Sequence, residues 1–161
     1  MITVRIVCVA GLIASLGGCA TQPKEPGSGR AGTERCKMTD EAEIRGLFER
    51  WNHSLQTGDP HKVVENYAPR SILLATQANP PLITVAEKEE YFHHFLENRP
   101  SGTIDFRMIQ IGCNSAFDAG LYTFEFAATQ KQVKARFTYT YRWDGKQWLI
   151  TSHHSSVLPN P

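Results

Sequence analysis

The chain has 161 residues, of which 41% are hydrophobic and 20% charged, the profile of a globular protein with room for one ordinary domain. Its 17 basic and 16 acidic side chains nearly balance, and no basic run appears, so nothing indicates a nucleic-acid-binding surface. A phosphate-binding glycine loop, a dinucleotide-binding fingerprint and the HExxH and GxSxG motifs are absent from the sequence, which disfavours several large enzyme classes.

The beginning of the chain has the pattern of an export signal. Arg5 precedes an apolar run at residues 6–16 that is too short for a comfortable membrane span. The sequence LGGC at residues 16–19 resembles a bacterial lipobox, in which the cysteine becomes the acylated first residue of the mature protein. We therefore predict a signal peptide at residues 1–18 and lipidation of Cys19. An ordinary cleaved signal peptide is the alternative.

The lipobox also implies a location. Lipid chains would hold the protein in the bacterial cell envelope, facing the periplasm, because the segment after Cys19 is neither apolar nor basic. Ala20 stands where an aspartate would argue for the inner membrane, so we expect the outer membrane. Residues 19–37 are rich in glycine, proline, serine and charge and should form a flexible tether. The folded domain should then span residues 38–159.

Two cysteines remain in the predicted mature protein besides the lipidated one, namely Cys36 and Cys113. An even number of cysteines in an oxidising compartment favours a disulfide. Such a bond would tie the start of the domain to a strand in the middle of the chain. Two buried free thiols are the alternative.

Helices and one strand are expected in the first half of the domain. Apolar residues recur at helical spacing after Asp40, which can cap a helix that Gly58 ends. Asp59 and Pro60 start a second, short helix, and Thr84 caps a third with Glu87 in the capping-box position. Between these two helices, RSILLAT reads as a short buried strand.

Four β-rich runs follow, at residues 102–114, 119–128, 132–143 and 147–156. Short polar turns join them, and the DGK sequence at residues 144–146 is a strong hairpin signal. This order of elements predicts an α+β domain in which N-terminal helices pack on a curved antiparallel sheet.

The strand at residues 134–143 alternates aromatic side chains on one face with lysine, arginine and threonine on the other. Such a strand suits a semi-polar cavity on one side of the sheet and a protein interface on the other. A three-residue hairpin loop would pair Trp143 with Gln147 and place Arg136 opposite His154, whereas a two-residue loop would break this pairing. Arg136 and His154 together could hold a carboxylate. An exposed or salt-bridged arginine is the alternative.

Two pairs of adjacent histidines, His93-His94 and His153-His154, invite a metal-binding interpretation that geometry opposes. Neighbours in a strand point to opposite faces, and neighbours in a helix diverge by about 100°. We therefore expect no metal site. One histidine of the terminal pair should enter the cavity, and we predict that it is His154, with His153 on the other side.

Two acidic residues, Glu125 and Asp105, lie within otherwise apolar runs. A lone acid in such a place could act as a general base with a raised pKa. Pairing with an arginine, such as Arg107 or Arg136, is the interpretation that we prefer.

A family resemblance rests on the segments LFERWNHSLQTGDPHKVVENYA, YFHHFL, GLYTFEF, ARFTYTY and WLITSHHSSVLP. They resemble the calcium/calmodulin-dependent protein kinase II association-domain family, and more closely its stand-alone bacterial members in the SnoaL-like, nuclear transport factor 2-like superfamily. The resemblance implies a cone-shaped α+β fold around a pocket, and pairing through the outer face of the sheet into a homodimer or larger ring. Kinase and calmodulin functions are not implied, because this chain has neither a kinase domain nor a calmodulin-binding segment.

The resemblance also implies a site. The kinase version has an arginine-lined pocket for small carboxylates, and Arg136 lies in the strand that carries one such arginine, while His154 lies near the family's terminal-strand histidine. The expected wall residues are Thr76, Tyr91, Glu125, Trp51 and Phe137.

From this pattern we expect a lipid-anchored, oligomeric domain that binds a small organic ligand, such as a carboxylate, without a cofactor. One alternative is a pocket enzyme, such as an isomerase, dehydratase or oxidoreductase-like protein, that uses His154 or Glu125 for acid/base chemistry. The other is a module that serves only homo-oligomerisation.

Overall fold

The computed structural model describes residues 35–159, so the predicted signal peptide, Cys19 and most of the tether lie outside the described residues. Its elements in chain order are α1 (Glu41–Leu55), α2 (Pro60–Val64), β1 (Tyr67–Leu74), α3 (Val85–Leu96), β2 (Pro100–Ile111), β3 (Ser115–Phe126), β4 (Lys131–Trp143) and β5 (Trp148–Val157). Within this range, no helix combines the length and the apolar character needed to cross a membrane.

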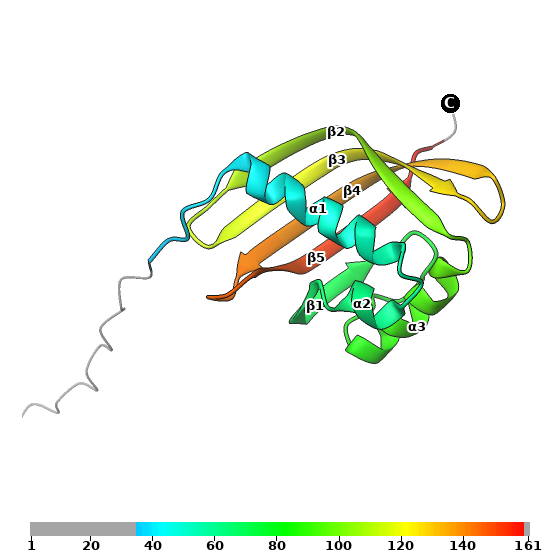
Figure 1. The fold of residues 1–161 in the computed structure, drawn as a ribbon, viewed down its shortest axis with the longest axis horizontal. Coiled ribbons are helices and arrows are strands. Elements are labelled where there is room, and N and C mark those ends of the chain that lie inside the picture. The colour runs from blue at the N-terminus through cyan, green and yellow to red at the C-terminus, as the bar shows by residue number, and fades with distance from the viewer. Residues whose placement is uncertain (1–34, 160–161) are drawn as a thin grey trace, which may run out of the picture. The chain divides into compact units, whose positions relative to one another are not determined.

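The five strands form one sheet in the order β1-β5-β4-β3-β2. Strands β2 to β5 are antiparallel neighbours, as expected, whereas β1 pairs in parallel with β5, so the sheet is mixed. Helix α1 lies across one face of the sheet, and α2 and α3 lie at its β1 side (Figure 1). The predicted α+β fold, with N-terminal helices on a curved sheet, is confirmed. We call the helix-covered face the inner face and the opposite face the outer face.

The helices begin at the predicted caps. The Asp40 carboxylate accepts a hydrogen bond from the backbone N–H of Glu43 at 2.8 Å, and Asp59 caps α2 just before Pro60. Thr84 and Glu87 form the complete capping box of α3. These contacts satisfy backbone donors that a helix leaves unpaired in its first turn.

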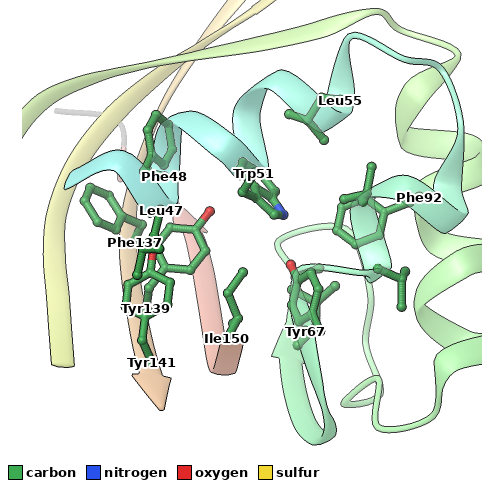
Figure 2. Close-up of a cluster of buried hydrophobic side chains, with 14 of the residues drawn as sticks. Leu47, Phe48, Trp51, Leu55, Tyr67, Phe92, Phe137, Tyr139, Tyr141 and Ile150 are labelled. Atoms are coloured by element: carbon green, nitrogen blue, oxygen red, sulfur yellow. The ribbon is translucent and has the colours of Figure 1, made fainter. Parts of the chain in front are cut away.

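Aromatic side chains of α1 and β4 pack against each other in the centre of the hydrophobic core. Phe48 and Trp51 on α1 pack against Phe137 and Tyr139 of β4, with the Trp51 and Tyr139 ring centroids 5.8 Å apart (Figure 2). All four side chains are buried, and burial of one such aromatic side chain contributes roughly 1.5–3 kcal/mol. This contact fixes the aromatic row of β4 on the inner face of the sheet.

The start of the domain is attached to the β2–β3 turn by a disulfide. Cys36 and Cys113 are bonded, with their Cα atoms 4.5 Å apart and 77 residues of sequence separation. The predicted pairing is therefore confirmed. In the chain-entropy model, closing a loop of this length stabilises the fold by about 4 kcal/mol, because it restricts the unfolded chain.

A buried ion pair, which the sequence did not reveal, lies on the inner face beneath α1. The Arg107 guanidinium donates to both carboxylate oxygens of Asp118, at 3.2 and 2.6 Å, and the two side chains are 7% and 0% exposed. The arginine pairings considered for Glu125 and Asp105 were wrong. Glu125 accepts a hydrogen bond from Gln132 and Asp105 accepts one from Thr123, both at exposed positions.

A bulge in β2 brings Arg107 to the inner face. Ile104 pairs with Tyr122, but the register then shifts so that Arg107 pairs with Gly120, and both Ile104 and Arg107 point inward although they are three residues apart. Gly120 is required at this point, because a Cβ atom there would lie 1.9 Å from the carbonyl oxygen of Phe106.

We predict that Asp118→Asn destabilises the fold by about 3 kcal/mol, because it leaves the Arg107 charge buried without its counter-charge. Urea denaturation of the two proteins measures the loss. Asp105→Asn is the matched control, since it removes a carboxylate from an exposed position of the neighbouring strand and should cost less than about 0.5 kcal/mol. Equal losses in the two variants would contradict the structural role of the pair.

Candidate functional site

The candidate site is a cavity of about 120 Å³ between α3 and the inner face of the sheet, which we call the inner cavity. Seven of its wall residues are aromatic, namely Trp51, Tyr91, Phe92, Phe95, Tyr122, Phe124 and Phe126. Among residues 35–159, no Asp, Glu, Lys or Arg side chain forms part of this wall. An engineered apolar cavity of about 150 Å³ holds benzene, so a ligand body of about one ring matches the volume of the inner cavity.

Strand β5 places His153 in the wall of the inner cavity. It is 4% exposed. Its ring stacks on Tyr139 with centroids 4.1 Å apart and packs edge-to-face with the Trp51 ring, with centroids 5.2 Å apart. The Nδ1 atom is 2.8 Å from the hydroxyl of Tyr67. Within the described part of the chain, the buried Nε2 atom has no hydrogen-bond partner.

Burial keeps the polar groups of this site uncharged. It lowers the pKa of His153 to about 3, with a smaller contribution from the neighbouring His154. It also raises the pKa of Tyr91 to about 12 and the pKa of Tyr67 well above its usual value of 10. At neutral pH the histidine therefore carries no charge and the phenols keep their protons. The inner cavity is equipped for hydrogen bonding and aromatic contact.

A second polar part of the cavity wall, made of hydroxyl groups, lies nearer the solvent. The Tyr122 hydroxyl donates to Ser155 Oγ at 2.6 Å, and the hydroxyl oxygens of Ser155 and Thr76 are 3.1 Å apart. Thr76 is exposed, whereas the wall residues next to His153 are almost completely buried. The inner cavity thus has hydroxyl groups towards its mouth and an imidazole towards its closed end.

The loop that carries Thr76 is held in place by Lys88 of α3. The Lys88 ammonium is buried and donates to the backbone carbonyls of Ser71 and Ile83 at 3.1 and 2.6 Å. Burial lowers its pKa. A reciprocal pair of backbone hydrogen bonds between Leu73 and Leu82 closes the same loop. These contacts position the mouth of the cavity against β1.

Three of the predicted wall residues line the inner cavity, and a fourth lies in the hydrophobic core. Trp51, Thr76 and Tyr91 are part of the wall of the inner cavity, although their contact with a ligand stays a prediction. Phe137 lies in the core instead, stacked on Phe48.

The predicted placement of Arg136 and His154 in the cavity was wrong. Arg136 pairs with Ser156, and His154 pairs with Thr138; Arg136 and His154 are both exposed on the outer face. The helices cover the aromatic face of β4, so the face that carries the arginine is turned away from the cavity. Glu125 is likewise exposed and outside the inner cavity.

Two irregularities explain the register. The loop between β4 and β5 has four residues, so that Trp143 pairs with Trp148. The Asp144 carboxylate stabilises this loop by accepting hydrogen bonds from two of its backbone N–H groups. A bulge then adds one residue of β5, since Tyr141 pairs with Ile150 but Thr140 pairs with Ser152. Both changes together move the partner of Arg136 from His154 to Ser156.

Sequence reasoning missed His153, and a signal for it was present. The same hairpin arithmetic that paired Arg136 with His154 pairs Phe137 with His153, since both pairs add up to 290. Phe137 belongs to the aromatic face of the strand, which a helix must cover. With a three-residue loop, His153 would therefore have been assigned to the inner face. The structure keeps it on that face because the longer loop and the bulge in β5 together shift the register by two residues.

Comparisons with known proteins agree with this architecture. The model of the family described as calcium/calmodulin dependent protein kinase II association domain matches residues 40–159. A solved structure described as a putative association domain of this kind, from Xanthomonas campestris, is 36% identical, with a TM-score of 0.73 over 79% of this chain and 96% of that chain. No curated protein matches.

More distant solved structures share the fold. An NTF2-like protein with a cystatin-like fold from Novosphingobium aromaticivorans is 12% identical, with a TM-score of 0.63 over 76% of this chain and 84% of that one. A Catenulispora acidiphila protein in complex with S-DNPA is also 12% identical, with a TM-score of 0.62 over 73% and 92%.

We predict that His153 makes stability fall in acid. The unfolded chain takes up a proton at this histidine near pH 6.5 and the folded protein near pH 3, so the unfolded state gains protons first as the pH drops. The stability from this group is complete above about pH 6.5 and declines by up to about 1.4 kcal/mol per pH unit below it.

Urea denaturation between pH 4.5 and 7.5 measures this slope, and His153→Phe should flatten it. Leu73→Ala is the matched control, because Leu73 lines the same cavity without titrating and should lower stability equally at each pH. A slope that is unchanged in His153→Phe would show that the histidine is not held neutral by the fold.

Proposed function

Because the chain belongs to the calcium/calmodulin dependent protein kinase II association domain family, whose NTF2-like fold is typical of oligomerisation or ligand-binding modules, we propose that it does both. In this proposal, copies of the domain associate through the outer face of the sheet, and each copy binds a small, uncharged, mainly apolar ligand in its inner cavity.

The neutral wall of the inner cavity carries the ligand proposal. An ionised carboxylate moved into an apolar site without a counter-charge is strongly disfavoured, and Arg136 lies on the outer face. A flat ligand of about one ring matches the aromatic wall and the volume of about 120 Å³. These features support an uncharged ligand in place of the carboxylate first expected.

Exposed apolar side chains on β2 and β3 support self-association. Phe106, Met108 and Leu121 are 62%, 51% and 36% exposed, and Phe106 pairs with Leu121 in the register of the sheet, so their side chains share the outer face. Contiguous exposed apolar surface of this kind marks an interaction site. A second copy of this chain is the proposed occupant, in keeping with the family's description as an association domain.

Binding is favoured over acid/base catalysis by the positions of the candidate catalytic groups. His154 and Glu125 are exposed and outside the inner cavity. A general acid or base must come within hydrogen-bond reach of the proton that it moves. A ligand in the inner cavity would not meet either group.

We further propose that Cys19 is lipidated after removal of residues 1–18, and that the lipid anchors the domain in the bacterial envelope, at the outer membrane. The LGGC sequence supports this proposal. In a bacterial host fed with labelled palmitate, the wild-type protein should incorporate label and fractionate with membranes. Cys19→Ala should do neither. Labelling of Cys19→Ala, or an unlabelled wild-type protein, would refute the anchor.

We predict that Phe106→Asp with Leu121→Asp converts the assembly into monomers, because two charges would replace paired apolar side chains in the proposed interface. Sedimentation velocity of the wild type and the variant gives the masses. Ile83→Asp is the matched control, since Ile83 is 58% exposed but lies between β1 and α3. A wild-type monomer, or a variant that keeps the wild-type mass, would contradict the proposed interface.

We predict that toluene and acetophenone raise the melting temperature, whereas benzoate and benzylammonium do not. A ligand at ten times its Kd should add about 1.4 kcal/mol of stability. Ala135→Leu, which fills the inner cavity, should remove the effect. Arg136→Ala, one residue away on the outer face, should keep it. Stabilisation by benzoate that is lost in Arg136→Ala would instead support a carboxylate site.

A further inference from the structure

The proton position on His153 identifies the chemistry that the inner cavity can recognise. Its imidazole is almost completely buried, and its Nδ1 atom is joined to the Tyr67 hydroxyl at 2.8 Å. The ring is neutral and therefore carries one proton, which is on Nδ1 or on Nε2. The Tyr67 contact decides between these two forms.

The phenol proton of Tyr67 needs an acceptor. Tyr67 is itself buried, and within residues 35–159 the acceptor that its hydroxyl meets is Nδ1 of His153. The Trp51 side chain also interacts with this hydroxyl, but an indole N–H can only donate. If Nδ1 carried the imidazole proton, the phenol proton would be buried without an acceptor, at a cost of about 1–3 kcal/mol. Donation from Tyr67 to Nδ1 satisfies the phenol and leaves one buried polar group unpaired, the Nε2 donor, whereas the other form leaves two unpaired, the phenol proton and the Nε2 lone pair. The imidazole proton is therefore on Nε2.

The Nε2–H group is then a hydrogen-bond donor without a protein partner. Within the described residues, Nε2 is buried and unpaired, and His153 forms part of the wall of the inner cavity together with Trp51 and Phe92. A buried donor that lacks an acceptor is destabilising, and a ligand that supplies the acceptor recovers this free energy. The same donor does not increase the affinity for a pure hydrocarbon, which has no acceptor.

We infer that the inner cavity selects uncharged ligands that combine a one-ring apolar body with a hydrogen-bond acceptor, such as a ketone or aldehyde oxygen, placed against Nε2 of His153. This inference rests on the proposed function and names the ligand class. The apolar body lies among the aromatic side chains. Ser155 is two residues further along the same face of β5, roughly 7 Å away, so its hydroxyl can contact a substituent nearer the mouth.

The first test needs no ligand. Two-bond ¹H–¹⁵N correlations of the imidazole in the wild-type protein at pH 7 distinguish a proton on Nε2 from one on Nδ1. We expect the Nε2–H form, and we expect Tyr67→Phe to lose this strict preference because the phenol donor is gone. A proton on Nδ1 in the wild type would overturn the inference.

The second test compares acetophenone with ethylbenzene, which has a similar size but no acceptor. The ratio of their Kd values is measured by calorimetry in the wild type and in His153→Phe, so that differences in hydration of the two ligands cancel. Loss of one hydrogen bond should shift the ratio against acetophenone by about 2- to 10-fold. Leu73→Ala is the control for altered cavity shape and should leave the ratio within about 2-fold.

The outcomes separate this inference from the proposed function. Binding of both ligands with a ratio that His153→Phe leaves unchanged would overturn the acceptor requirement and keep the neutral pocket. Failure of both ligands to bind the wild type would overturn the neutral pocket itself. If His153→Phe does not fold, Tyr67→Phe gives the same comparison, and its weaker preference for acetophenone is the expected result.

Discussion

The packing of α1 on the aromatic row of β4 is the contact on which the rest of the domain depends. Phe48 and Trp51 cover Phe137 and Tyr139, and this burial decides which face of the sheet is the inner one. Helix α1 fills one part of this face, while α3 stands off from the sheet at the β1 side and contributes the far wall of the cavity. The core and the cavity are therefore neighbouring parts of a single aromatic layer.

Side-chain alternation makes small irregularities in the strands decisive. A shift of one residue in register moves every following side chain to the other face of a sheet. The bulge in β2 brings Arg107 inward to Asp118. The bulge in β5 decides which terminal histidine faces inward. Without it, His154 would pair with Phe137 and enter the cavity in place of His153.

Two of the buried polar sites among residues 35–159, the Arg107–Asp118 pair and His153, solve the problem of desolvation in different ways. Arg107 and Asp118 are both charged and compensate each other with two hydrogen bonds. His153 has no counter-charge and stays neutral, because burial holds its pKa near 3. The ion pair is complete without a further partner, whereas the imidazole keeps an unused nitrogen. Because His153 also lines the inner cavity, whereas Arg107 and Asp118 do not, this difference separates a structural site from one that can recognise a ligand.

Local patterns in the sequence determined the elements of the fold. The caps at Asp40 and Thr84, the helical spacing of the apolar residues and the alternating strands are short-range properties, and the Cys36–Cys113 pairing was predicted from the number of cysteines and the expected compartment. The family was recognisable from segments spread along the domain. Tertiary structure decided the site, because the faces of β4 and β5 are assigned by the helix that covers them and by a bulge at Thr151. Neither the covering helix nor the bulge can be read from the HHSS segment itself. For this reason the cavity histidine was predicted to be His154, whereas the structure shows His153.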